Sequence, residues 1–134
     1  MSLVVDTSAI IAIVLGEDDS ETLAEVLAAS TDSIMSAVSL VEATIVAEAR
    51  LGPSGGLLVQ RVIREAQIAV VDVTNEAALD AIDGWRTFGK GRHRAALDLG
   101  DCFTYALALR SNAAVLCTGN DFSRTDIAVH PPAP

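Results

Sequence analysis

Short apolar runs alternate along this chain with longer segments whose apolar residues recur at helical spacing. The apolar runs predict buried strands at 3–5, 33–35, 68–73, 113–117 and 127–129. The longer segments predict helices at 9–15, 37–50, 57–66 and 102–110, with further helices after residues 21 and 75. Because helices alternate with strands throughout, we predict an α/β fold whose central, mostly parallel β-sheet is flanked by helices.

Hydroxyl and carboxylate residues stand just before most of the predicted helices, where their side chains can cap free backbone N–H groups. The candidate N-caps, in chain order, are Thr7 or Ser8, Ser36, Thr74 or Asn75, and Asp98. Asp101 follows Asp98 at the third helical position, so the pair resembles a capping box with Asp in place of Glu. The glycine-rich stretch at 52–56 predicts a break between two helices.

Polar residues follow two of the predicted strands directly. Asp6 comes immediately after the strand at 3–5, and Asp121 follows the strand at 113–117. Parallel strands end at the same edge of a sheet, and ligands collect outside that edge. We therefore expect the two carboxylates to lie near each other, with neutral oxygens from Thr7, Ser8, Thr118 and Asn120 beside them.

Two further acids lie in first turns of helices that begin near this edge, Glu42 and Asp101. Periodicity alone leaves Glu42 facing either water or the site. Asp98 is explained by helix capping, and Asp126 is an extra acid that we leave outside the cluster.

Convergence of four carboxylates requires protons or cations, because two unit charges about 4 Å apart repel by roughly 4 kcal/mol at an effective dielectric of 20. All candidate ligands are oxygens, and neither His nor Cys belongs to the set, so Mg²⁺ or Mn²⁺ is favoured over zinc. Such ions serve phosphodiester hydrolysis by activating water and neutralising phosphate charge.

The composition of the chain adds expectations about its domain organisation, its core, its cysteines and its location. At 134 residues the chain has the size of one domain, so we expect a single domain over 1–134. With 51% hydrophobic but only 4% aromatic residues, the core must consist mainly of Ala, Val, Leu and Ile. Cys102 and Cys117 are expected to be buried thiols. No basic leader or membrane-length apolar run is present, which leads us to expect a soluble cytoplasmic protein.

The net charge of −9 makes the body acidic, but basic residues gather at 86–94. The segment 89–94 has the glycines and charge of an exposed, mobile loop. This loop either improves solubility or holds a phosphate backbone, in which case Arg92 and Arg94 are the candidate RNA contacts.

An ordered set of motifs resembles the PIN-domain ribonucleases, and more narrowly the VapC toxins of type II toxin–antitoxin modules. The motifs are VDTSA at 5–9, SLVE at 39–42, LGDC at 99–102 with YALA at 105–108, and TGNDF at 118–122. The resemblance extends in order and spacing over nearly the whole chain.

The resemblance implies a PIN-like fold and a Mg²⁺-dependent endoribonuclease, with Mn²⁺ as a substitute. It implies that Asp6, Glu42, Asp101 and Asp121 form the catalytic, metal-binding site. Thr7, Thr118 and Asn120 would support these acids, Thr118 and Asn120 where the family places such groups. The resemblance also implies a homodimer and a VapB-like antitoxin whose basic tail suppresses cleavage.

The sequence also leaves two alternative functions open. One is a metal-dependent phosphatase in which Asp6 is the nucleophile, although the usual two-Asp signature needs an acid where Ser8 stands. The other is a non-catalytic PIN-like binding module, for which four mutually repelling carboxylates have no evident purpose.

Overall fold

The computed structural model describes residues 2–130 and contains one parallel sheet with the strand order β3-β2-β1-β4-β5. Its strands are β1 (Ser2–Val5), β2 (Asp32–Ser36), β3 (Ala69–Val71), β4 (Ala114–Leu116) and β5 (Val129–His130). All the predicted strands are therefore present, within a few residues of their predicted limits, and the α/β fold class is confirmed.

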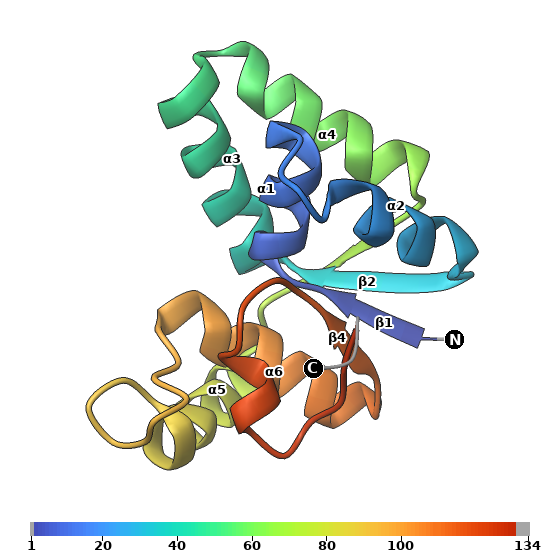
Figure 1. Cartoon of the computed structure of the whole chain (residues 1–134). Coiled ribbons are helices and arrows are strands. Elements are labelled where there is room, and N and C mark those ends of the chain that lie inside the picture. The colour runs from blue at the N-terminus through green and yellow to red at the C-terminus, as the bar shows by residue number, and fades with distance from the viewer. Residues whose placement is uncertain (1, 131–134) are drawn as a thin grey trace.

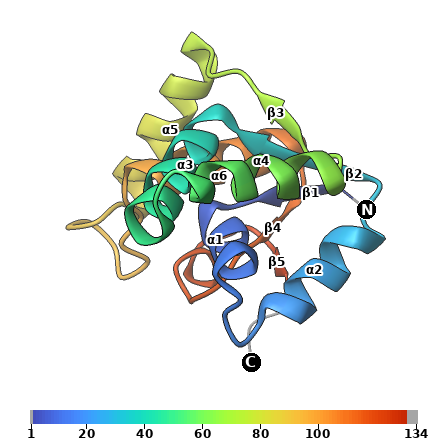
Figure 2. The same cartoon turned by 90° about the horizontal axis from the view of Figure 1, so that it is seen from above.

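Helices cover both faces of this sheet (Figure 1). The helices are α1 (Thr7–Leu15), α2 (Ser20–Ala29), α3 (Ala37–Leu51), α4 (Ser54–Glu65), α5 (Asn75–Phe88) and α6 (Leu99–Ser111), with a short 3-10 helix at Phe122–Arg124. In Figure 1, α1 to α4 lie on one side of the sheet and α5 and α6 on the other. The view from above shows the first group in front of the sheet (Figure 2).

Alternating side chains of the central strands enter two apolar cores, one on each face. Val4 and Val115 pack in the core beneath α5 and α6, whereas Val5 and Leu116 pack in the core beneath α1 to α4. Strands that are buried on both faces carry continuous apolar runs, which explains the run that begins the chain. Asp6, the residue that follows β1, therefore lies at the end of a strand that is buried on both faces.

Successive strands are added first on one side of β1 and then on the other. From β1 the chain proceeds through β2 to β3 on one side, then returns to β4 and β5 on the other. Such a switch point leaves a crevice outside the carboxyl ends of the two neighbouring strands, and that crevice is where doubly wound sheets bind ligands. Here the strands are β1 and β4, which lead directly into Asp6 and into the segment containing Thr118.

The N-cap of α1 is Asp6, so the prediction of Thr7 or Ser8 was wrong. Asp6 has extended backbone angles, and its carboxylate accepts a hydrogen bond from the Ser8 backbone N–H. The helix begins immediately after β1 because a carboxylate is already in place to cap it. The predicted caps at Ser36 and Asp98 are confirmed, and Thr74 rather than Asn75 caps α5.

The glycine-rich stretch contributes to helix packing as well as to a turn. α4 begins at Ser54, earlier than predicted, and Gly55 lies against the backbone of α3. A Cβ atom at Gly55 would overlap the Ala47 carbonyl, so the absence of a side chain lets the two helices pack closely.

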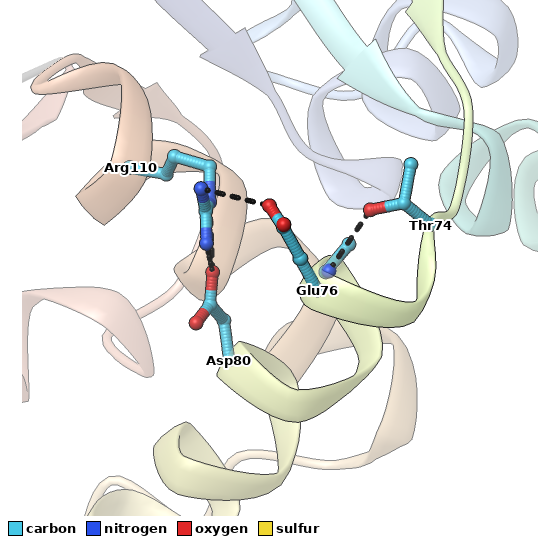
Figure 3. Close-up of polar contacts among 5 residues, drawn as sticks. Thr74, Glu76, Asp80 and Arg110 are labelled. Atoms are coloured by element: carbon cyan, nitrogen blue, oxygen red, sulfur yellow. Dashed lines mark hydrogen bonds and ion pairs between the residues drawn. The ribbon is translucent and has the colours of Figure 1, made fainter.

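Exposed ion pairs join α5 to α6 (Figure 3). Arg110 of α6 donates to Asp80 at 2.6 Å and to Glu76 at 3.4 Å, while the Thr74 hydroxyl caps α5 by accepting from the Ala77 N–H. Exposed pairs of this kind contribute at most about 1 kcal/mol, so the apolar contact between the helices is the main stabilisation. No helix within residues 2–130 is long and apolar enough to cross a membrane.

Candidate active site

Asp6 is a buried carboxylate with hydrogen bonds to both oxygens. Its side chain is only 4% exposed. Oδ2 accepts from the Ser8 backbone N–H at 3.0 Å and from the Ser8 hydroxyl at 2.7 Å, and Oδ1 accepts from the Thr104 hydroxyl at 3.0 Å. Burial raises the pKa of Asp6, and these hydrogen bonds oppose that rise by favouring the ionised form.

Among residues 2–130, no basic side chain forms an ion pair with Asp6. The ion pairs of the described residues involve Arg61, Arg86 and Arg110, all more than half exposed and paired with acids of the surface. Asp6 is therefore stabilised by dipoles alone within the described part of the chain. Such an arrangement leaves a negative potential at the carboxyl end of β1.

Glu42 faces the end of β1 rather than bulk water. It lies on α3, is partly buried, and accepts a hydrogen bond from the Thr7 hydroxyl at 2.8 Å. Burial raises the pKa of Glu42, and the negative charges of Asp98 and Asp6 add to that effect. The structure thus decides the question that periodicity left open, and it places Thr7 as the residue that orients Glu42.

Asp101 reaches the same edge from the first turn of α6. Its carboxylate accepts from the Asp98 N–H at 3.1 Å, and the Asp98 carboxylate accepts from the Asp101 N–H at 2.9 Å, which makes the predicted capping box. Burial raises the pKa of Asp101 to about 8, and the charges of Asp6, Asp98 and Asp121 contribute to the rise.

A glycine allows α6 to approach α3 this closely. A Cβ atom at Gly100 would overlap the carboxylate of Glu42. The residue preceding Asp101 is therefore in direct contact with another acid of the site, and glycine leaves room for that contact.

The residues after β4 contribute in different ways. The Thr118 backbone N–H donates to the Ser8 hydroxyl at 3.0 Å, which ties this segment to Asp6. Asp121 is exposed, yet its charge raises the pKa of Asp101 and of the buried Cys117 thiol. Within residues 2–130, the Asn120 side chain makes no hydrogen bond to these acids, and its supporting role stays a prediction.

Together these residues form an acidic cluster, which we define as Asp6, Glu42, Asp98, Asp101 and Asp121. Asp98, assigned from sequence only to capping, also raises the pKa of Asp6, Glu42 and Asp101 through its charge. Asp126 lies outside the cluster and accepts a hydrogen bond from the Tyr105 hydroxyl at 2.8 Å.

The donor set of this cluster fits a hard divalent cation, because every available donor is oxygen and the acids raise one another's pKa values. Within residues 2–130, however, no group of three or more His, Cys, Asp or Glu side chains is already arranged to hold a metal ion. Binding would therefore require the carboxylates to draw together around the cation.

The basic loop 89–97 exposes Lys90, Arg92 and Arg94, buries Ala95 and Leu97, and is tied at both ends. Lys90 N–H donates to the Leu97 carbonyl at 2.9 Å, and Leu97 N–H donates to the Phe88 carbonyl at 3.0 Å. The Arg92 guanidinium lies over the Trp85 ring, 4.2 Å from its centroid. Arg92 thus contacts α5, while the predicted mobility of the loop stays a prediction.

The cysteine prediction is confirmed, since both thiols are free and buried.

Sequence reasoning missed two buried hydroxyls, Ser39 and Thr104. Ser39 lies on α3 between apolar neighbours and its oxygen is 3.3 Å from that of Thr104, which donates to Asp6. A hydroxyl on the buried face of an apolar helix needs a partner, and that signal was present in the sequence at both positions.

A PIN domain family model matches residues 3–128. The chain therefore belongs to the PIN-domain family, as its motifs predicted. Within that family it is 41% identical over 126 residues to ribonuclease VapC30 of Mycobacterium tuberculosis, covering 94% of this chain and 96% of the relative. It is 42% identical over 126 residues to ribonuclease VapC of Mycolicibacterium smegmatis, covering 94% and 98% of the two chains.

Solved structures share the same fold. The sarcin-ricin loop cleaving toxin VapC20 of Mycobacterium tuberculosis superposes with a TM-score of 0.78 at 18% identity, covering 94% of this chain and 96% of that one. A chain of the DNA-bound VapBC of Salmonella typhimurium gives a TM-score of 0.71 at 19% identity, with 97% of both chains covered.

The raised pKa of Asp101 predicts a pH dependence of stability in the absence of metal. Between about pH 4 and pH 8 the folded protein keeps a proton that the unfolded chain releases, so stability falls as pH rises through this window. Below the window the carboxyl is neutral in both states, and above it both states are ionised. Asp101→Asn can still cap α6 and should flatten the fall.

The measurement is the melting temperature against pH in EDTA, with Asp18→Asn, an exposed acid, as the control. The control should follow the wild type. An Asp101→Asn curve parallel to that of the wild type would contradict the raised pKa of Asp101 and the burial and neighbouring charges that cause it.

Proposed function

We propose that this protein is a Mg²⁺-dependent endoribonuclease toxin of a type II toxin–antitoxin module, which hydrolyses RNA phosphodiester bonds at the acidic cluster. The observation that carries the proposal is the uncompensated Asp6 carboxylate at the β1–β4 switch point, with Glu42 and Asp101 directed to the same edge. The membership of the PIN-domain family and the VapC ribonuclease relatives support RNA as the substrate.

Asp6 and Asp101 would be the main ligands of the cation in this proposal. Glu42 would assist as a ligand or through a bound water, and Asp121 would complete the site through water. When bound, the ion supplies an activated water and neutralises phosphate charge, and Mn²⁺ should substitute for Mg²⁺. A chain with a net charge of −9 has a particular need for such neutralisation before a polyanion can approach.

The chain's own residues prepare this site. Ser8 and Thr104 hold the Asp6 carboxylate from opposite oxygens, and Thr7 orients Glu42. These hydrogen bonds orient Asp6 and Glu42 before any cation arrives, and closure around the cation would then complete the site.

RNA would meet the protein through the basic loop. Arg92 is held over Trp85, and Arg94 is exposed on the same loop. Guanidinium groups hold phosphate well, and contacts to phosphate position a nucleic acid without reading its sequence. The loop thus supplies local attraction on an otherwise acidic surface.

Protein partners belong to the same proposal. The structural neighbours include VapBC complexes, and an antitoxin of VapB type with a basic segment would match the surplus of negative charge. Large apolar side chains are exposed at Val41 (57%), Ile45 (63%) and Leu99 (76%), which supports protein contacts, including the expected homodimer.

Cleavage should require a divalent cation and the Asp6 carboxylate. Wild-type protein with Mg²⁺ or Mn²⁺ should produce defined RNA fragments, and EDTA should abolish them. Asp6→Asn should lower the rate by more than about 100-fold, since even outer-shell partners of metal ligands contribute roughly 10- to 100-fold. The measurement is sequencing of the fragments' 5′ ends. Glu25→Gln, an exposed acid on α2, should leave the rate unchanged. Full activity in EDTA would refute the metal requirement.

Arg92→Gln and Arg94→Gln should each weaken RNA binding by a similar factor for all sequences. Each should also reduce the slope of log affinity against log salt by about 0.7 on single-stranded RNA, as loss of one phosphate contact requires. The measurement uses the Asp6→Asn background to prevent cleavage, with Arg64→Gln on α4 as the control. An unchanged salt slope, or an effect on one sequence alone, would show that these arginines do not act on phosphate.

A further inference from the structure

Two fully buried hydroxyls connect helices α3 and α6 to Asp6. The Thr104 hydroxyl of α6 donates to Asp6 Oδ1 at 3.0 Å, and the Ser39 hydroxyl of α3 lies 3.3 Å from Thr104 Oγ1. Both residues have no exposed surface. A buried polar pair of this kind is retained only when its hydrogen bonds are satisfied.

The chemistry of the hydroxyl group determines which atom is the donor in each of these two hydrogen bonds. A threonine hydroxyl has one proton, and Thr104 directs it to Asp6 Oδ1. Ser39 must therefore be the donor to Thr104. The protons run in one direction, from Ser39 through Thr104 to Oδ1 of Asp6.

A second series of hydrogen bonds reaches the other oxygen of Asp6. The Thr118 backbone N–H donates to the Ser8 hydroxyl at 3.0 Å, and the Ser8 hydroxyl donates to Asp6 Oδ2 at 2.7 Å. The carboxylate is thus held from both sides, and its rotation is restricted. Its remaining lone pairs are left for a ligand.

Helical spacing relates Ser39 and Thr104 to the other acids of the cluster. Ser39 precedes Glu42 by three residues on α3, and Thr104 follows Asp101 by three residues on α6. Residues three apart lie on the same side of a helix. The contact between the two hydroxyls therefore sets how closely the helices bring Glu42 and Asp101 to Asp6.

We propose that Ser39 and Thr104 are positioning residues that orient the Asp6 carboxylate and hold α3 and α6 against each other, so that Glu42 and Asp101 stay near enough to Asp6 to close around a divalent cation with it. This inference rests on the proposed metal-dependent function. Neither hydroxyl touches the cation or the RNA. Their effect is exerted through Asp6 and through the packing of the two helices.

The test measures Mn²⁺ affinity of the full chain by electron paramagnetic resonance without RNA, beside the melting temperature and the cleavage rate. Thr104→Val keeps the shape of the side chain and removes the hydroxyl, and it should weaken Mn²⁺ binding by about 10- to 100-fold. Thr104→Ser should restore most of the affinity. Ser39→Ala should have a smaller effect in the same direction, because the Thr104 bond to Asp6 remains.

Thr44→Val is the matched control, since the Thr44 hydroxyl on α3 donates only to the Leu40 carbonyl of its own helix. It should lower Mn²⁺ affinity little, even if it lowers the melting temperature. Wild-type affinity in folded Thr104→Val would overturn the inference, as would equal losses in Thr104→Val and Thr44→Val. If Thr104→Val does not fold, unchanged affinity in Ser39→Ala overturns it.

Failure of the proposed function would look different. In that case the wild type itself would neither bind Mn²⁺ nor cleave RNA, and the positioning role would fail with it. Wild-type binding and cleavage together with an unaffected Thr104→Val would refute the positioning role alone.

Discussion

The site depends on one electrostatic constraint, the burial of the Asp6 carboxylate without a basic partner. A buried charge is tolerated only when it is paired or well hydrogen-bonded. Here the compensation comes from the dipoles of Ser8 and Thr104, at the end of a strand buried on both faces. Burial raises the pKa of Asp6, and the hydrogen bonds oppose that rise by favouring the ionised form. In the function we propose, a divalent cation compensates this charge.

The surrounding architecture places further carboxylates near Asp6. The capping requirements of α1 and α6 place Asp6, Asp98 and Asp101 at helix starts, where each carboxylate accepts backbone N–H groups. Gly100 then lets α6 approach Glu42 on α3. Local helix capping and long-range packing thus bring the acids to one edge. The positive ends of the helices make the concentration of negative charge tolerable.

Much of this arrangement could be predicted from the sequence because it follows from local rules. Apolar runs gave the strands, and the parallel topology gave the edge at which Asp6 emerges. The side-chain directions could not be predicted in the same way. Whether Glu42 faces water or the site depends on the Thr7 hydroxyl and on the glycine of another helix, both distant in sequence. The hydroxyls of Thr7 and Ser8 predicted the cap of α1 wrongly, because the Asp6 carboxylate both caps the helix and lies in the acidic cluster.

The buried hydroxyl chain was also out of reach of periodicity, since Ser39 and Thr104 are 65 residues apart. A crystal structure with Mn²⁺, with anomalous scattering used to locate the ion, tests the central claim most directly. We predict an anomalous peak coordinated by the carboxylates of Asp6 and Asp101, with Glu42 turned toward it. A structure at saturating Mn²⁺ with no ion at Asp6, and with the acids unmoved, would contradict the account.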